Sequence, residues 1–336
     1  MGELELYDIT IIGGGPVGLF GAYYAGLRQM KTKIIDSLAE LGGQVTALYP
    51  EKYIFDVAGL PKISGKELVK NLVEQASQYH PMVCLEERVQ NVRKQGDLFI
   101  IATQKQQHAS KVVILAMGVG AFSPKKLDRV DLEKYEGKSV FYFVKDKSIF
   151  KGKRLLIVGG GDSAFDWAMN LQEMAKEITL IHRRDQFRAH EDTIKKVFSS
   201  PVKIKLFYEL KGIQGKDRIE TAVIYDNRTR AEEILSVDMI LVNIGFSANL
   251  GPIAEWGVPV EKNTIIVNEK METGVPGIYA AGDVITHGGK LKLIATGFGE
   301  IAIAVNQGVH FVNPKLKAFP GHSSEMSPPP LAVKVA

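Results

Sequence analysis

Apolar runs followed by glycine clusters and helix-like segments occur twice along the chain. The β-branched run Leu6–Ile12 predicts a buried parallel strand, and VGLFGAYYAGLR, after the glycines, predicts a helix. A second strand is predicted at KTKIIDS. The same order returns in RLLIV, DSAFDWAMNL and EITLIH. Strands that alternate with helices predict an α/β fold with parallel sheets, here with two dinucleotide-binding domains of the Rossmann type.

The first glycine cluster has the spacing of a phosphate-binding turn. Gly13 permits a tight turn, Gly15 lets the backbone approach a pyrophosphate, and Gly18 lets the helix pack closely on the strand. Asp36 ends the second strand about 20 residues later, where a carboxylate can bind a ribose hydroxyl. A glycine turn without a ligand is the alternative. The strand before it, the helix after it and the acid together favour a dinucleotide site.

The second cluster repeats the turn with different chemistry beside it. Its small residues are Gly159, Gly161 and Ala164. The end of the next strand carries basic side chains: His182, Arg183, Arg184 and Arg188. A carboxylate would repel a 2′-phosphate, whereas guanidinium groups bind one with charge-assisted hydrogen bonds. These residues could also be a solvated strand end, but their position after the turn favours NADP(H). The first turn then suits a different dinucleotide, FAD.

Two similar segments mark where the chain crosses between the predicted domains. KVVILAMGVGAFSP and DMILVNIGFSAN are each a strand followed by glycine-containing sequence. They predict an NADPH domain inserted into a discontinuous FAD domain. The predicted parts are a first FAD part at 1–118, the NADPH domain at 119–248, a second FAD part with a C-terminal flavin cap at 249–322, and a flexible Pro-rich tail at 323–336. SPKKLDRVDLEKYEGK, near the first crossing, is interpreted as a solvated connection.

Composition limits the chemistry. The 336 residues are 45% hydrophobic and 24% charged, and the net charge of +4 is too small to indicate nucleic-acid binding. The single cysteine, Cys84, excludes an intrachain disulfide and a dithiol centre, and we expect it in a buried strand. The histidines lack metal-ligand spacing, so no metal is expected. Without a signal peptide or an apolar run of about 18 residues, we expect a cytoplasmic protein with no membrane contact.

As a set, GGGPVG, LGGQV, GGGDSA, HRRDQFRA and GIYAAGDV resemble the thioredoxin-reductase-like flavoproteins, over roughly residues 8–322. That family often carries Cys-x-x-Cys before the second glycine turn, whereas Tyr142 and Lys145 stand at the matching places here. With the ending FPGHSSEM, the chain resembles the bacterial ferredoxin/flavodoxin–NADP⁺ reductases of this type. The resemblance implies FAD, NADP(H), a ferredoxin or flavodoxin partner and a homodimer.

The resemblance also implies roles for single residues. The implied FAD contacts are Gly13, Gly15, Gly18, Asp36, Gly43, Gln44, Asp283, Ala295 and Thr296. Tyr49 and His322 would stack on the two faces of the flavin. The residues alone leave alternatives open: Asp283 could be a helix N-cap before VITHG, Tyr49 half-buried packing before Pro50, and His322 a surface tail residue.

The implied reaction needs no acid or base from the protein. NADPH gives a hydride to flavin N5, and the electrons leave singly to a one-electron carrier. The domains would move about hinges at residues 118–120 and 245–247. Two rivals remain open: an NADPH-dependent disulfide or peroxide reductase that relies on the thiols of a partner, and a non-catalytic NADPH/FAD sensor.

Overall fold

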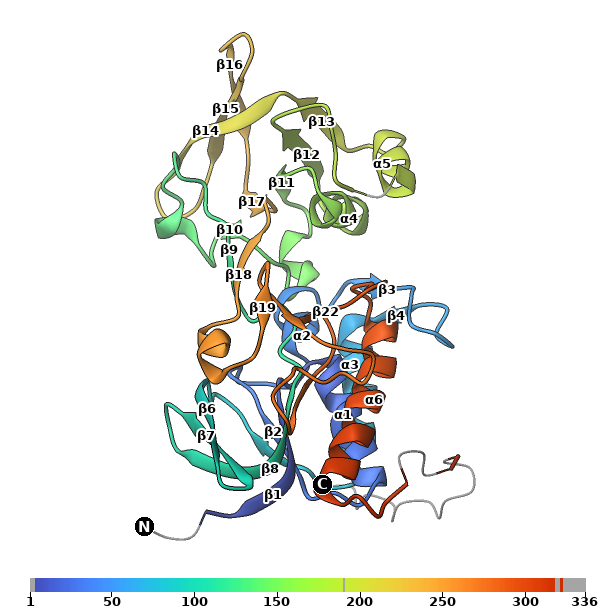
Figure 1. Cartoon of the computed structure of the whole chain (residues 1–336). Coiled ribbons are helices and arrows are strands. Elements are labelled where there is room, and N and C mark those ends of the chain that lie inside the picture. The colour runs from blue at the N-terminus through green and yellow to red at the C-terminus, as the bar shows by residue number, and fades with distance from the viewer. Residues whose placement is uncertain (1–3, 190, 318–320, 323–336) are drawn as a thin grey trace. The chain divides into compact units, whose positions relative to one another are not determined.

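The chain forms two compact units. The structure is a computed structural model, and it describes these residues: 4–189, 191–317 and 321–322. Unit 1 comprises Met1–Ala121 and Ala248–Ala336, and unit 2 is Phe122–Ser247. The chain passes between the units twice, in β9 (Ala121–Pro124) and β18 (Phe246–Asn249), which pair with each other. Figure 1 labels the elements of both units.

Unit 1 is built around one mixed sheet. Its elements are β1 (Leu6–Ile12), α1 (Pro16–Leu27), β2 (Thr32–Ile35), α2 (Gly43–Leu48), β3 (Tyr53–Ile54), β4 (Ile63–Ser64), α3 (Gly65–Ser77), β5 (Met82–Cys84), β6 (Val89–Gln95), β7 (Leu98–Thr103), β8 (Gln107–Leu115), a 3-10 helix (Pro252–Trp256), β19 (Val260–Glu261), β20 (Thr264–Ile266), β21 (Ile278–Ala280), β22 (Ile285–Thr286) and α6 (Ile294–Val312). The sheet order is β5-β2-β1-β8-β7-β6, and β21 also pairs with β8.

The sequence pattern explains the two halves of this sheet. All four residues of β2 are buried, as expected for a parallel strand covered on both faces. In β7 buried positions alternate with half-buried ones, and its pairing with β6 and β8 is antiparallel. The parallel strands β5, β2, β1, β8 and β21 place their carboxyl ends together. The glycine turn after β1 therefore lies at that common edge.

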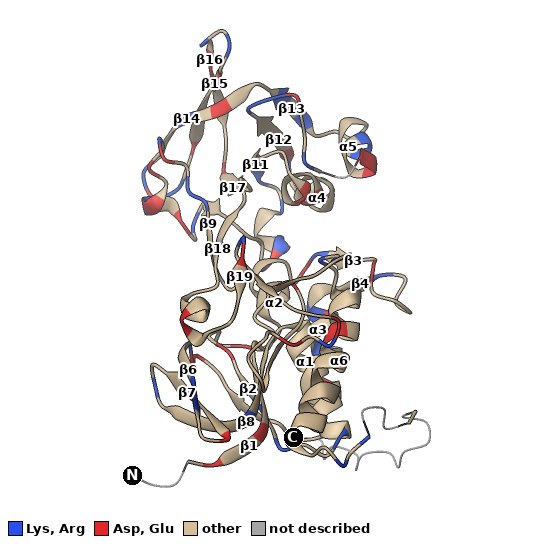
Figure 2. Cartoon of the chain, in the orientation of Figure 1, with Lys and Arg blue, Asp and Glu red and all other residues tan. Residues whose placement is uncertain are grey.

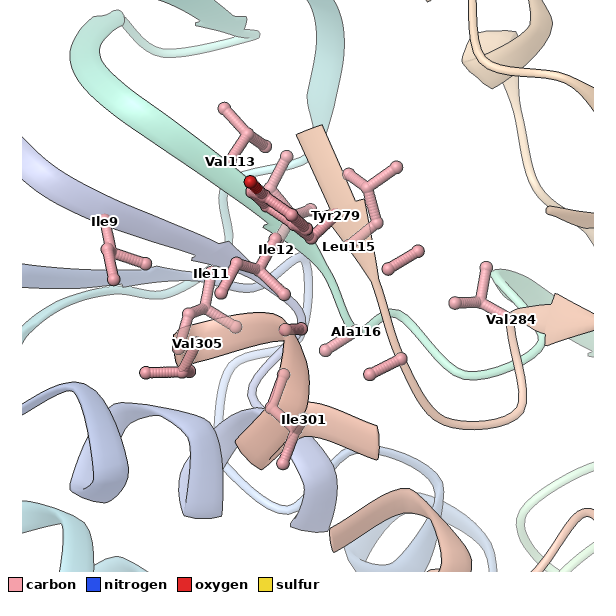
Figure 3. Packing of buried hydrophobic residues seen from close by; sticks show 14 of the residues in the cluster. Ile9, Ile11, Ile12, Val113, Leu115, Ala116, Tyr279, Val284, Ile301 and Val305 are labelled. Carbon is pink, nitrogen blue, oxygen red and sulfur yellow. The ribbon is translucent and has the colours of Figure 1, made fainter. Parts of the chain in front are cut away.

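Helices α1, α3 and α6 pack beside one another against the parallel strands (Figure 1). Ile301 and Val305 of α6 point toward Ile11 of β1, and all three are fully buried (Figure 3). Burying such a side chain contributes about 1.5–3 kcal/mol. The helices approach closely because a Cβ added at Gly21 of α1 would lie 2.6 Å from Ile301 Cγ1. This core fixes the start of α6 near the start of α1.

Unit 2 repeats the strand–turn–helix plan. Besides the crossing strands, its elements are a 3-10 helix (Glu133–Tyr135), β10 (Val140–Phe141), a 3-10 helix (Lys147–Phe150), β11 (Arg154–Val158), α4 (Asp162–Leu171), β12 (Glu177–His182), α5 (Glu191–Phe198), β13 (Lys203–Leu206), β14 (Tyr208–Gln214), β15 (Thr221–Asp226), β16 (Glu232–Ser236) and β17 (Met239–Val242). The parallel order is β10-β17-β11-β12-β13, and β14-β15-β16 form an antiparallel sheet. The predicted α/β class is confirmed. No helix among the described residues is long and apolar enough to span a membrane.

Candidate cofactor-binding sites

The first glycine turn joins β1 to α1 with no room for side chains. Gly13 has φ +112°, and a Cβ there would overlap the carbonyl group of Ala116. A Cβ at Gly18 would overlap the carbonyl oxygen of Gly13. The tight turn predicted for Gly13 and the close helix–strand packing predicted for Gly18 are therefore both seen in the fold.

The amino end of α1 is open to a ligand. Gly15 is its N-cap and supplies no side-chain hydrogen bond, and Pro16 follows at the first helical position. The first N–H groups of a helix lack partners within the helix and attract anions. Gly43, at the start of α2, faces this end, because a Cβ there would lie 3.0 Å from Gly15 Cα. The backbones of Gly15 and Gly43 thus lie close together beside the first N–H groups of α1.

Asp36 is tied to the same turn. Its Oδ2 accepts a hydrogen bond from Gly14 N at 2.5 Å, and its Oδ1 accepts one from Leu38 N at 2.8 Å. The side chain is buried, and burial raises the pKa of this carboxyl. Asp36 therefore holds the turn in shape, and its predicted contact with a ribose stays a prediction.

Asp283 and Tyr49 meet from distant parts of unit 1. Asp283 follows β21, is half-buried, and has a pKa raised by burial. Burial, and then the charge of Asp283, raise the pKa of Tyr49 to about 12. The alternative interpretation of Asp283 as a helix N-cap is wrong, because the chain continues into the strand β22. Asp283 lies just beyond the carboxyl end of β21, at the edge of the sheet that also carries the first glycine turn.

The first turn of α6 adjoins Asp283. The N-cap residue of α6, Leu293, makes no side-chain hydrogen bond, and Ala295 and Thr296 are half-buried in the first turn. A Cβ added at the next residue, Gly297, would lie 3.5 Å from Gly282 Cα. The Asp283 turn, the start of α6 and the start of α1 are thus gathered around one region of unit 1.

Two other predicted flavin-site residues differ in their surroundings. Gln44 lies in α2, and its Nε2 would be 2.8 Å from a Cβ at Gly118. Gln44 therefore stands beside the turn after β8. His322 is exposed in the single chain, and its stacking on a flavin stays a prediction. The Pro-rich tail at 323–336 lies outside the described residues.

The second glycine turn joins β11 to α4. Gly159 has φ +154°, and a Cβ there would overlap the carbonyl of Asn243 and lie 3.2 Å from Ala164 Cβ. Gly161 is the N-cap of α4, with no side-chain hydrogen bond and nothing within 4 Å of an added Cβ. Arg188 N donates to Gly160 O at 2.9 Å, which brings the basic loop after β12 onto the turn. This turn is also open to an anion.

The basic residues predicted to select NADP(H) line one cavity of unit 2, with a volume of about 1610 Å³. His182 is within hydrogen-bond distance of Gln186 O (Nε2···O, 3.1 Å), and burial lowers the pKa of its ring. Arg184 has a buried Nε with no hydrogen-bond partner, while Arg183 and Arg188 are exposed. An unsatisfied buried guanidinium N–H is a donor that an anionic ligand can satisfy.

Sequence reasoning missed other basic residues that line this cavity. They are Lys125, Lys126, Arg129, Lys211 and Arg230. The first three belong to the stretch that we interpreted as a solvated connection, and this interpretation was incomplete. Lys125, Lys126 and Arg129 follow β9, whereas Lys211 and Arg230 come from the β14–β16 segment. Figure 2 colours Lys and Arg blue. The position of Lys125, Lys126 and Arg129 after a crossing strand was the one sequence feature that could have indicated a role in this cavity.

The places that match the Cys-x-x-Cys pair have other roles here. Tyr142 is buried, and its hydroxyl donates to Glu136 Oε1 at 2.8 Å. Asn243 Nδ2 donates to the carbonyl of Tyr142 at 3.3 Å. Lys145 is exposed. Tyr142 thus makes structural hydrogen bonds within unit 2 at a place where the family often has a thiol.

Cys84 lies in a strand, β5, as predicted, but it is half-buried and not buried, because β5 is at the edge of the sheet. It belongs to a polar network of unit 1. Cys84, Glu87 and His108 place possible ligand atoms within 4.8 Å of one another. His108 Nε2 is 2.9 Å from Glu87 Oε2, and Lys33 Nζ is 3.0 Å from His108 Nδ1. Thr103 also donates to Glu87 Oε2. Because both ring nitrogens already have partners, we interpret this group as a structural link between β2 and β8.

Comparison with known proteins supports the motif-based resemblance. A family model described as pyridine nucleotide-disulphide oxidoreductase matches residues 7–308. The chain belongs to this family. It is 54% identical over 326 residues to a ferredoxin–NADP reductase 2 of Chloroherpeton thalassium, covering 95% of each chain. It is 52% identical over 324 residues to a ferredoxin–NADP reductase of Halalkalibacterium halodurans, covering 96% of this chain and 98% of that one.

Solved structures of thioredoxin reductases share the fold. The enzyme from Lactococcus lactis aligns with a TM-score of 0.78 and 28% identity over 91% of this chain and 99% of that one. The enzyme from T. acidophilum aligns with a TM-score of 0.79 and 25% identity over 90% and 98%. The predicted resemblance to thioredoxin-reductase-like proteins is confirmed.

Proposed function

We propose that this chain is an FAD-dependent ferredoxin–NADP⁺ reductase that passes electrons between NADPH and a one-electron carrier. The observation that carries the proposal is the high identity, along nearly the whole chain, to two relatives with that name. The single cysteine supports it, since a thioredoxin-reductase-like chain with one thiol cannot form its own redox disulfide.

FAD fits the glycine turn of unit 1 and the residues gathered around it. The residues that would hold it are Gly13, Gly15, Gly18, Asp36, Gly43, Gln44, Asp283, Ala295 and Thr296. Gly13 and Gly18 allow the tight turn at the start of α1, and two helix N-termini without side-chain caps offer N–H donors. Tyr49 would cover one flavin face, next to Asp283.

NADP(H) fits the cavity of unit 2. Gly159, Gly161 and Ala164 would hold the pyrophosphate at the start of α4. The 2′-phosphate would bind the basic group His182, Arg183, Arg184 and Arg188. The buried Arg184 Nε without a partner supports this assignment, because a phosphate oxygen would satisfy it.

The protein's contribution to the reaction is binding and orientation. Bound FAD supplies hydride acceptance from NADPH at N5 and one-electron release to a carrier. No side chain is required as acid or base, which agrees with a predicted site made mainly of backbone donors and carboxylates. The glycines at 118, 120 and 245, all with positive φ, flank the paired crossing strands and would allow hinge motion.

The partner and assembly belong to the same proposal. Ferredoxin is the carrier named for the relatives, and flavodoxin is the second candidate. We propose a homodimer in which His322 reaches the flavin of the other subunit, because Pro314 and Pro320 prevent α6 from continuing. A cytoplasmic location agrees with electron carriers of this kind.

The test is steady-state NADPH oxidation by the purified protein with ferredoxin, flavodoxin, thioredoxin and no acceptor. We expect a flavin spectrum, turnover with ferredoxin, and no reduction of thioredoxin. Alkylation of Cys84 should leave turnover unchanged, because burial raises the pKa of this thiol and no step of the proposed reaction uses a thiol. Ferredoxin turnover should fall with salt, which screens steering of an acidic carrier to a basic protein.

The rival functions give different results. A disulfide reductase would need an added thiol protein and would lose activity on alkylation of that partner. A sensor would bind NADPH without steady turnover with any acceptor. Either result, with ferredoxin inactive, refutes the proposal.

A further inference from the structure

Beside Asp283, unit 1 contains a buried charged cluster that consists of Glu300, Lys290 and His287. Glu300 lies in α6, and both of its carboxylate oxygens are 2.7 Å from Lys290 Nζ. The side chains of Glu300 and Lys290 are each only 6% exposed. His287 Nε2 lies 3.3 Å from Glu300 Oε1. Removing two charges from water is costly, so stability alone is a weak reason for this pair.

The cluster links two segments that carry proposed flavin contacts, the Asp283 turn and the start of α6. Glu300 Oε2 accepts a hydrogen bond from Gly282 N at 2.9 Å, the residue before Asp283. Glu300 itself belongs to α6, whose first turn carries Ala295 and Thr296. The Asp283 turn and the start of α6 are therefore both anchored to one carboxylate.

Charge at this place is balanced. The charges of Lys290, Lys292 and Glu300 all act on Asp283, and Tyr49 is its neutral neighbour. The start of α6 adds the partial positive charge of a helix N-terminus. Lys292 is exposed, so water screens it, whereas Lys290 and Glu300 interact through protein. Removing either member of the buried pair would leave the other uncompensated.

We infer that the Glu300–Lys290–His287 cluster positions the Gly282–Asp283 turn against α6, and that the pairing of Glu300 with Lys290 cancels the effect that either charge alone would have on the reduction potential of the bound flavin. The inference rests on the proposed function, since it requires FAD in unit 1. Reduction adds negative charge to the cofactor. A nearby fixed positive charge therefore favours the reduced form and a negative charge favours the oxidised form.

The experiment compares Glu300→Gln and Lys290→Gln holoenzymes. Glu300→Gln leaves the lysine charge and should raise the midpoint potential. Lys290→Gln leaves the carboxylate and should lower it. At a fixed solution potential, we expect the reduced-to-oxidised ratio to change about fivefold or more in opposite directions. The double variant should return close to the wild-type potential. A redox-dye titration measures all three, and FAD titration of the apoproteins reports affinity.

The exposed pair Lys31–Glu5 in the same unit supplies matched controls. Lys31→Gln and Glu5→Gln remove the same charges at the surface and should leave the potential unchanged. Shifts of both cluster variants in the same direction would show a purely structural role and overturn the inference, as would shifts of equal size in the controls.

The design separates this inference from the proposed function. A wild-type protein without a flavin spectrum refutes the proposed function itself. A wild-type flavoenzyme whose cluster variants keep its potential refutes only the inference. Should a single variant fail to hold FAD, the double variant decides, because it leaves neither charge unpaired. A double variant with a strongly shifted potential then overturns the inference.

Discussion

The two glycine turns of this chain share a backbone design and differ in what stands beside them. Both follow a parallel strand, both have a first glycine with positive φ, and both start a helix without a side-chain cap. At the end of the second strand, unit 1 has Asp36, which accepts hydrogen bonds from Gly14 N of the turn and from Leu38 N of its own loop. Unit 2 has His182 and arginines that line a cavity. The two turns thus share a backbone geometry, and our prediction assigns the choice of nucleotide to the side chains beside them.

The third small residue of each turn also differs. A Cβ at Gly18 would overlap the Gly13 carbonyl oxygen, whereas Ala164 keeps its methyl group buried beside Gly159. The first turn therefore brings helix and strand closer than the second does. The third position of the motif therefore accommodates a methyl group only where the helix lies further from the turn.

Gly18→Ala should have the largest effect. The methyl group would meet backbone, which cannot move aside, so the cost should reach the upper end of the ~1–3 kcal/mol typical of overpacking. FAD affinity should fall about a hundredfold. FAD titration of the apoprotein measures it, with Ala164→Gly as the matched variant of the other turn. Equal losses of FAD in both variants would contradict the difference between the turns.

Arg184→Ala should weaken NADPH binding while NADH binding stays nearly unchanged. Loss of one charge-assisted hydrogen bond, worth about 1.5–3 kcal/mol, corresponds to roughly a ten- to hundredfold rise in the NADPH Kd. Lys203→Ala is the control, because Lys203 is exposed, pairs with Glu177 and does not line the cavity. If NADPH and NADH lose affinity alike, Arg184 does not bind the 2′-phosphate.

Asp36→Asn should affect the first turn alone. The two N–H donors, Gly14 N and Leu38 N, bind different oxygens of the carboxylate, so in the amide variant one of them would face the NH2 group, which is a donor and cannot accept. We expect about 1 kcal/mol of lost turn stabilisation, seen as a roughly fivefold weaker FAD affinity. NADPH affinity, measured on the same preparation, is the internal control. An unchanged FAD affinity would show that these two hydrogen bonds do not shape the site.

Asp238→Asn should have the smallest effect, on the stability of unit 2. Asp238 Oδ1 is 2.6 Å from Arg154 Nη2, and this bond helps to hold β17 beside β11. The Arg154 guanidinium lowers the pKa of Asp238 to about 2. The stabilisation is therefore present above the unfolded pKa of about 4 and is lost as the pH falls toward 2.

Denaturant unfolding at several pH values measures this contribution. Because both side chains are about one third exposed, Asp238→Asn should lower the free energy of unfolding by about 0.5–1 kcal/mol at pH 7. The difference from wild type should shrink between pH 4 and pH 2. A difference independent of pH would mean that the ion pair is not its source.

Local chemistry allowed much of this protein to be predicted from sequence. Glycine spacing after a β-branched run predicts a phosphate-binding turn, because the geometry of such a turn depends on a few adjacent residues. Both turns formed as expected. The arginines after the second turn indicated NADP(H) for the same reason. An intrachain dithiol was excluded by counting alone, since the chain has one cysteine.

Contacts between distant residues required the tertiary structure. Lys125 and Arg230 are far apart in sequence, yet they line the same cavity. Glu300 meets Lys290 and Gly282 only because α6 packs where β21 ends. Asp36 holds the turn, because the fold places its Oδ2 within hydrogen-bond distance of Gly14 N. The sequence by itself therefore determined the two turns and their nucleotide chemistry. Packing brings remote side chains within hydrogen-bond distance. It therefore decided which residues line each site, which charges lie near it and which hydrogen bonds hold its turns.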